Sequence, residues 1–126
     1  MLEVMQTIDA SSVPSIAPDD RAIDLVHLSR TTMGDRALER EVLQLFDRQS
    51  SILIERMRNV APAGVVTLAH TLKGSARGVG AWRVARAAEE LELAGSTGHP
   101  TGEALDRLTA ASDEARALIA ELLRTN

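Results

Sequence analysis

The chain has 126 residues, enough for one domain, and 44% of them are hydrophobic, which allows one compact core. A single Phe, a single Trp and no Tyr leave Leu, Val, Ile and Ala to fill that core, and this composition favours helices over a β-sandwich or barrel. The formal net charge of -4 disfavours nucleic-acid binding. The absence of cysteine excludes disulfides, thiolate metal sites and thiol nucleophiles.

The first 18 residues are predicted to be a flexible leader outside the core, because their apolar periodicity is weak. They contain the small polar and helix-breaking residues Ser11, Ser12, Pro14, Ser15 and Pro18. No signal-peptide pattern opens the chain, and no later stretch is apolar for long enough to span a membrane. We therefore expect a cytoplasmic protein with no membrane partner.

Residues 19–126 are predicted to form the domain, and it begins with a short helix and a long one. Asp19 and Asp20 follow Pro18 as helix-starting carboxylates, which predicts a short helix from about Asp20 to Thr31. Gly34 then interrupts the pattern, and Asp35 can cap a long amphipathic helix. The apolar stripe predicted for that helix, with one polar exception, is Leu38, Val42, Leu45, Phe46, Gln49, Ile52, Leu53 and Val60.

Three further helices complete the predicted domain. The third runs from about Val65 to the glycines near Gly80, the fourth from Ala81 to about Ala94, and the fifth follows a loop at 95–101. Packing residues predicted for the fourth are Trp82, Val84, Ala85, Ala88, Leu91 and Leu93. Those predicted for the fifth are Leu105, Leu108, Ala111 or Ser112, Ala115, Leu118, Ile119 and Leu122. The expected architecture is all-α, an antiparallel four-helix bundle with a short additional N-terminal helix.

The third predicted helix has two faces of different chemistry. With about 100° between successive residues, its apolar residues gather on one side that should face the core. These are Val65, Ala69, Leu72, Ala76 and Val79. A second stripe, related by steps of three and four residues, lies well away from the first. It consists of His70, Lys73, Gly74 and Arg77.

The second stripe suits phosphoryl transfer, to which a protein contributes mainly positioning and charge stabilisation. An exposed imidazole is in large part neutral and nucleophilic near pH 7. Lys73 and Arg77 would disfavour the imidazolium form and would attract phosphate oxygens after transfer. Gly74 lowers helix stability by roughly 0.5 to 1 kcal/mol relative to Ala. Close approach by a partner explains such a glycine, and so do helix packing or simple tolerance.

Residues 69–76, Ala-His-Thr-Leu-Lys-Gly-Ser-Ala, and the following Val79-Gly80-Ala81 resemble the signature of histidine-containing phosphotransfer (HPt) domains. The resemblance extends more weakly over about residues 20–124. It implies a four-helix bundle in which His70 is the phospho-acceptor and Lys73 stabilises the phosphate. It also implies that Gly74 leaves room for a docking receiver domain and that Ser75 makes a polar contact there, while Arg77 is a candidate for the rim of that surface. Ala76 stands where many members have a small polar residue, which weakens any hydrogen-bonding role at that position.

The same resemblance implies partners and a reaction. His70 would accept phosphoryl from a receiver-domain aspartate and donate it to another, with response-regulator receivers and a hybrid histidine kinase as partners. No cofactor is expected on this chain, and Mg²⁺ is expected in the partner receiver. The sequence has no glycine-rich nucleotide loop, so we expect a phosphoryl carrier without ATP-dependent kinase activity. A monomer is the simplest oligomeric state.

Two other classes of function remain open at this stage. A non-catalytic adaptor would bind or sequester a response regulator through the same surface without accepting phosphate. A nucleotide-dependent histidine kinase would take phosphoryl directly from ATP, which the missing ATP-binding domain argues against. The other histidines, His27 and His99, have no spacing that would create a metal site with His70.

Overall fold

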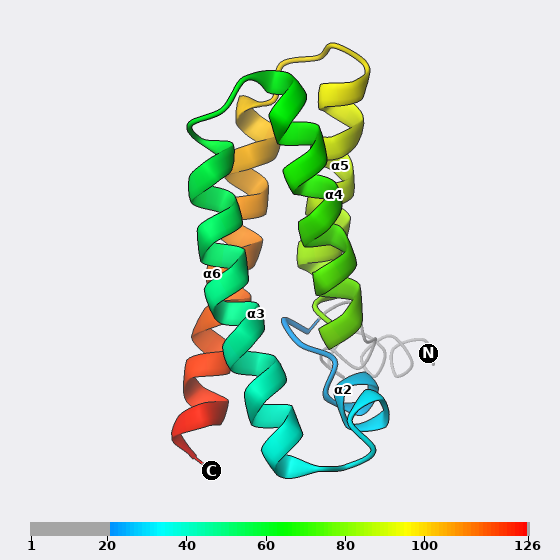
Figure 1. Ribbon diagram of the computed structural model, residues 1–126, viewed down its shortest axis with the longest axis vertical. Coiled ribbons are helices and arrows are strands. Elements are labelled where there is room, and N and C mark those ends of the chain that lie inside the picture. Colours follow the sequence, from blue (N-terminus) through cyan, green and yellow to red (C-terminus); the bar gives the residue numbers. More distant parts are fainter. Residues whose placement is uncertain (1–20, 126) are drawn as a thin grey trace, which may run out of the picture.

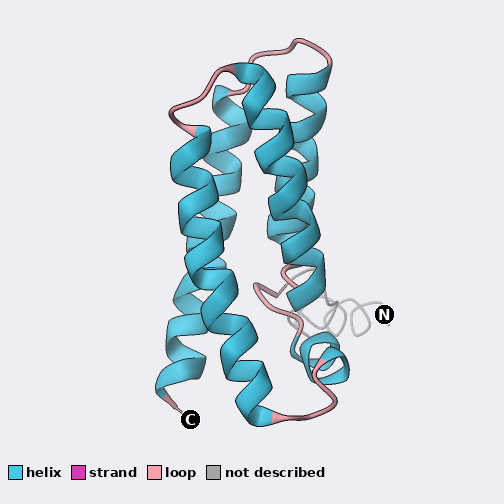
Figure 2. Cartoon of the chain, in the orientation of Figure 1, coloured by secondary structure: helices cyan, strands magenta, loops and turns pink. Residues whose placement is uncertain are grey.

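Four long helices stand side by side in the computed structural model, which describes residues 21–125 (Figure 1). These are α3 (Arg36–Met57), α4 (Pro62–Val79), α5 (Trp82–Ser96) and α6 (Gly102–Arg124), and the short α2 (Leu25–Thr31) lies near the C-terminal end of α4. Short loops join successive antiparallel helices, and the described range contains no strand (Figure 2). The predicted four-helix bundle with a short extra helix is confirmed. The predicted leader, residues 1–18, lies outside the described residues.

The first helix begins later than predicted. The sequence predicts a start at about Asp20, but α2 begins at Leu25. Asp24 is its N-cap, with a side chain that accepts a hydrogen bond from the His27 N–H at 3.1 Å. Residues 21–23 form bends, and Ile23 is completely buried. The chain therefore inserts an apolar anchor into the core before the helix starts. Asp19 and Asp20, on which the prediction depended, lie outside the described residues.

The long helix α3 is capped as predicted, but part of its predicted apolar stripe does not face the core. Asp35 accepts a hydrogen bond from the Leu38 N–H at 3.1 Å. The buried residues are Leu43, Phe46, Ser50, Leu53, Ile54 and Met57. Leu45 and Ile52 are 57% and 52% exposed, and Leu38 is exposed as well. The predicted inclusion of Val60 is wrong, because α3 ends at Met57 and Val60 lies exposed beyond it. The helix carries two neighbouring apolar stripes, and only the one that contains Phe46 and Leu53 faces the core.

The other helices follow their predicted faces closely. All five residues predicted for the core side of α4 are buried, and α6 buries Ala104, Leu108, Ser112, Ala115 and Ile119. Leu105, Ala111, Leu118 and Leu122 pack against this core as partly buried residues. Leu93 of α5 is 63% exposed, so its predicted packing role is wrong, because it points away from the face that contains Leu91. No helix between residues 21 and 125 has both the length and the apolar composition needed to cross a membrane.

The turn between α4 and α5 is tied to the start of α2. Gly80 has a φ of 82°, in the left-handed region, and its carbonyl accepts a hydrogen bond from the Asp24 N–H at 2.8 Å. Asp24 Oδ2 accepts a hydrogen bond from the Trp82 indole N–H at 2.9 Å, and the Trp82 ring packs edge-on against His27. The Trp82 hydrogen bond is the main cause that lowers the pKa of Asp24, followed by the His27 N–H. Trp82 thus joins α2 to α5 while part of it stays exposed.

We expect Gly80→Ala to destabilise the protein more than Gly98→Ala. Both glycines have left-handed φ values, so either alanine should lower the free energy of unfolding by about 1 to 2 kcal/mol. An added Cβ at Gly80 would also lie 2.9 Å from the Asp24 carbonyl oxygen, whereas Gly98 has open space. Urea unfolding of the two variants measures the difference. Equal losses would show that the turn relaxes away from Asp24 without penalty.

Candidate functional site

His70 lies on the outer side of α4, with a side chain that is 67% exposed. Its neighbours Ala69 and Leu72 are completely buried on the opposite side of the helix. Because these core contacts fix the rotation of α4 about its axis, the imidazole is held toward solvent. The site is therefore built on a packed helix and not on a loop.

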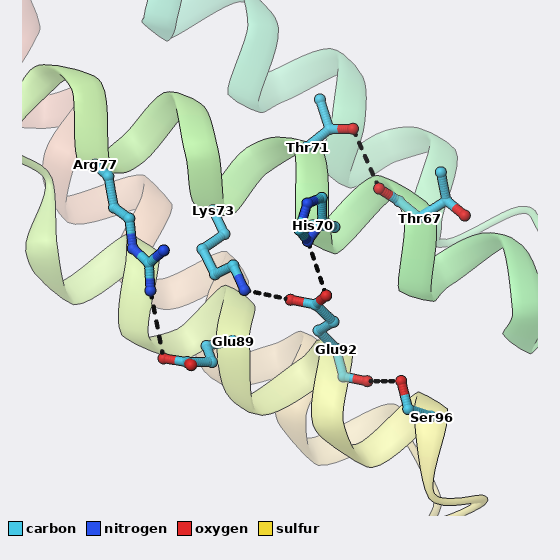
Figure 3. A network of polar contacts seen from close by, with 8 residues as sticks. All are labelled: Thr67, His70, Thr71, Lys73, Arg77, Glu89, Glu92 and Ser96. Carbon is cyan, nitrogen blue, oxygen red and sulfur yellow. Dashed lines mark hydrogen bonds and ion pairs between the residues drawn. The ribbon is translucent and has the colours of Figure 1, made fainter.

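The polar partner of the imidazole comes from α5 (Figure 3). His70 Nδ1 lies 2.8 Å from Glu92 Oε2, and Lys73 Nζ lies 2.8 Å from Glu92 Oε1. One carboxylate is thus shared between the imidazole and the ammonium group. The Lys73 and Glu92 side chains are only 14% and 22% exposed, so their ion pair is partly shielded from water. This contact holds three side chains in one arrangement at the surface of the α4–α5 pair.

The charge state of Glu92 determines which imidazole nitrogen carries a proton. The Lys73 ammonium is the largest cause that lowers the pKa of Glu92, and it outweighs the opposing effect of burial; the contact with His70 lowers this pKa further. Glu92 is therefore ionised at neutral pH and accepts hydrogen bonds only. Its partner Nδ1 must then be the donor, and in the neutral ring this leaves Nε2 as the unprotonated, nucleophilic nitrogen.

The remaining predicted site residues surround this contact. Gly74 is exposed, and a Cβ added there would have no neighbour within 4 Å. Packing against another helix therefore does not explain this glycine. Arg77 pairs with Glu89 of α5 at 3.8 Å (Figure 3), and both side chains are more than half exposed. Ser75 is partly buried and takes no part in the Glu92 contact.

Glu92 is the residue that the sequence analysis missed. The sequence pattern predicts two cations and a glycine near His70, whereas the structure places a carboxylate between the imidazole and Lys73. The signal was available in the spacing around the α4–α5 turn. His70 precedes Ala81 by 11 residues (81 − 70), and Glu92 follows it by 11 (92 − 81). In an antiparallel hairpin with a short turn, residues at equal separation lie opposite one another.

No metal site accompanies these residues. Within residues 21–125, no group of three or more His, Cys, Asp or Glu side chains is arranged to hold a metal ion. His27 packs on Trp82, and His99 Nδ1 lies 2.6 Å from the Thr97 hydroxyl, so neither histidine approaches the site around His70.

We expect Glu92→Gln to lower the stability of the protein at pH 7 but not at low pH. A carboxylate with a lowered folded-state pKa stabilises the fold above its usual value of 4.5, and this stabilisation is lost as the pH falls through the lowered value. Because the pair is partly exposed, the loss at pH 7 should be below about 1 kcal/mol. Urea unfolding from pH 7 to pH 3 measures it, with Glu103→Gln, at an almost fully exposed carboxylate, as the control. A loss that does not change with pH would argue against the ion pair.

Comparison with protein families agrees with this site. The family model described as the Hpt domain matches residues 41–123, which include His70, Lys73 and Glu92. Neither the curated proteins nor the solved structures gave a match to this chain. Hpt domains have a phosphotransfer role in phosphorelays and generally interact with receiver domains and kinases. Since the matched residues make up more than half of the chain, the protein belongs to the Hpt domain family.

Proposed function

We propose that this protein carries phosphoryl groups on His70 in a multistep phosphorelay, accepting them from one receiver-domain aspartate and donating them to another. Its membership in the Hpt domain family supports a phosphotransfer role in general. The observation that carries the assignment to His70 is its exposed imidazole, whose Nδ1 is held by Glu92 while Nε2 is left for reaction. The donor is proposed to be a hybrid histidine kinase, and the acceptor a response regulator.

In the proposed forward step, the Nε2 lone pair of His70 attacks the phosphorus of an aspartyl phosphate. A nitrogen–phosphorus bond forms, the bond from phosphorus to the aspartyl oxygen breaks, and the aspartate leaves as a carboxylate. The imidazole ring becomes cationic as it takes up the phosphoryl group. Glu92, already bonded to Nδ1, stabilises this charge without further rearrangement. The transfer from His70 to the next aspartate follows the reverse course.

Lys73 has two proposed roles. Its contact with Glu92 keeps that carboxylate ionised, and it places a cation beside the imidazole, where the phosphate oxygens arrive. An ammonium group has three N–H donors, so a bond to Glu92 leaves others for the phosphoryl group. Mg²⁺ is expected in the acidic site of the partner receiver, and no residue of this chain is assigned to it.

The receiver is proposed to dock over Gly74, one helical turn beyond His70. The bare helix surface there lets another backbone approach closely, while Ser75 offers a polar contact and Arg77 lies at the rim. Such a relay contact must form and dissociate repeatedly, so its area should be near or below the standard of roughly 1,600 Å². We propose that the protein acts in the cytoplasm, as a monomer whose core is closed by its own helices.

Replacing His70 should abolish phosphoryl uptake. We expect His70→Gln to take up no label from a panel of phosphorylated receiver domains, because no other group would form the nitrogen–phosphorus bond. His99→Gln is the matched control, since His99 is also exposed and should leave uptake unchanged. Helical circular dichroism checks that both variants fold. Receiver binding without label on the wild-type chain would instead favour the adaptor function.

Removing the carboxylate should change the tautomer of His70. In Glu92→Ala, we expect the neutral imidazole to lose its preference for a proton on Nδ1, and the uptake rate to fall. The nitrogen chemical shifts of the His70 ring measure the tautomer, which a purely structural role of Glu92 would not alter. Glu92→Gln retains an oxygen that accepts from Nδ1 and should restore part of the preference. An unchanged tautomer in Glu92→Ala would contradict the positioning role.

A side chain at Gly74 should block transfer without harming the fold. We expect Gly74→Leu to slow uptake from receivers, because the added side chain would fill the surface that the partner approaches. Gly78→Leu is the control, since Gly78 lies in the same helix and also has open space around an added Cβ. Both variants should be at least as stable as wild type, because glycine is a poor helix former. Equal rates of uptake by the two variants would show that Gly74 is not part of the docking surface.

A further inference from the structure

An apolar surface on α3 is left without a partner. Leu45 and Ile52, seven residues apart on one face of the helix, are both more than half exposed. They lie in a shallow groove along α3 that we call the α3 groove. It is lined by Leu45, Arg48, Gln49, Ile52, Leu53 and Arg56. Two exposed aliphatic side chains in one groove form a surface that favours an apolar partner.

Two arginines give the α3 groove a positive charge. Within the described part of the chain, no ion pair is found for Arg48 or Arg56, whereas six other cations have one: Lys73, Arg77, Arg83, Arg107, Arg116 and Arg124. Arg48 and Arg56 stand four residues before and four residues after Ile52, so they flank its side chain along the helix. The groove therefore favours a segment that combines aliphatic side chains with carboxylates.

Residues 1–20 of this chain have that composition. They include four carboxylates and no lysine or arginine. The carboxylates are Glu3, Asp9, Asp19 and Asp20, and the aliphatic residues Leu2, Val4, Met5 and Ile8 stand between or beside the first two. An extended segment of 20 residues spans up to roughly 66 Å, whereas a 22-residue helix such as α3 is about 33 Å long. Chain length therefore permits the segment to reach the groove from Arg21.

The α3 groove lies at the same height in the bundle as His70. The antiparallel helices α3 and α4 are joined by residues 58–61, and Gln49 precedes Arg58 by nine residues while His70 follows Ala61 by nine. Residues equally distant from the connection of a helical hairpin lie side by side. A segment bound in the groove would thus lie next to the helix that carries His70, where a docking receiver needs room.

We propose that residues 1–20 bind the α3 groove, with aliphatic contacts to Leu45 and Ile52 and carboxylate contacts to Arg48 and Arg56, and compete with receivers for access to His70. The second part of this inference rests on the function proposed above. A tether of this length gives an effective concentration near 1 mM, so a weak contact suffices for partial occupancy. The segment then lowers the rate of transfer without preventing it.

The binding part is tested without phosphoryl transfer. Because the chain has no cysteine, Thr7→Cys provides a single site for a spin label on the full-length protein. We expect the label to broaden the amide signals of residues 45–56 and not those of α5 around Leu93, which is equally exposed. Arg48→Glu with Arg56→Glu should abolish the broadening, and adding Glu3→Arg with Asp9→Arg should restore it. The proposed binding would be wrong if no signals broadened, if signals of other residues broadened instead, or if the broadening did not change in these charge-reversal variants.

The competition is tested by the rate of phosphoryl uptake from a receiver. Glu3→Arg with Asp9→Arg should release the segment and raise the rate by roughly twofold or more, as expected for a contact that is about half occupied. If this variant loses the broadening but takes up phosphoryl at an unchanged rate, the segment does not compete with receivers. If charge reversal at Arg48 and Arg56 weakens receiver binding while the label causes no broadening, the groove belongs to the receiver and our inference is wrong. The spin-label experiment does not depend on phosphoryl transfer, so its result would stand even if His70 were not the phospho-acceptor.

Discussion

The turn at Gly80 sets the geometry on which the site depends. Its left-handed backbone ends α4 and lets α5 begin at Trp82, so the two helices return along one another with almost no loop. That short connection fixes which residues of α4 and α5 lie opposite each other, and His70 meets Glu92 as a result. Asp24, the N-cap of α2, holds this turn in place: its N–H donates to the Gly80 carbonyl, and its carboxylate accepts from the Trp82 indole N–H. A change in this turn would shift the register of α4 relative to α5.

In the phosphoryl transfer proposed above, the shared carboxylate would meet two opposing demands on the histidine. A nucleophilic imidazole must not be held in its cationic form before the reaction, yet its positive charge must be stabilised once phosphorus is bound. Lys73 counters part of the negative charge of Glu92 in the resting protein, while Glu92 directs the ring proton to Nδ1. In the proposed transfer the ring becomes cationic, and the same carboxylate is already in contact with it. Partial shielding of the pair from water strengthens both effects.

Sequence patterns predicted the parts of the fold in which one face of a helix is distinctly apolar. On α4, a single run of Val65, Ala69, Leu72, Ala76 and Val79 identified the buried side, and with it the outward direction of His70. On α3, two apolar stripes lie side by side, and periodicity alone cannot tell which of them the other helices cover. Ser50 added to the ambiguity, because it is fully buried with its hydroxyl bonded to the Asp47 carbonyl oxygen.

Glu92 was not predicted for a different reason: its role depends on a contact with His70, from which it is separated by 22 positions in the sequence. Helical spacing relates residues within one helix, but a partner on the next helix becomes visible only when the length of the turn is known. The first helix shows the same limit: the prediction relied on Asp19 and Asp20, whereas the helix is capped by Asp24, which follows the buried Ile23. Contacts between elements therefore decide what local patterns leave open, both for helix ends and for the polar partner of the histidine.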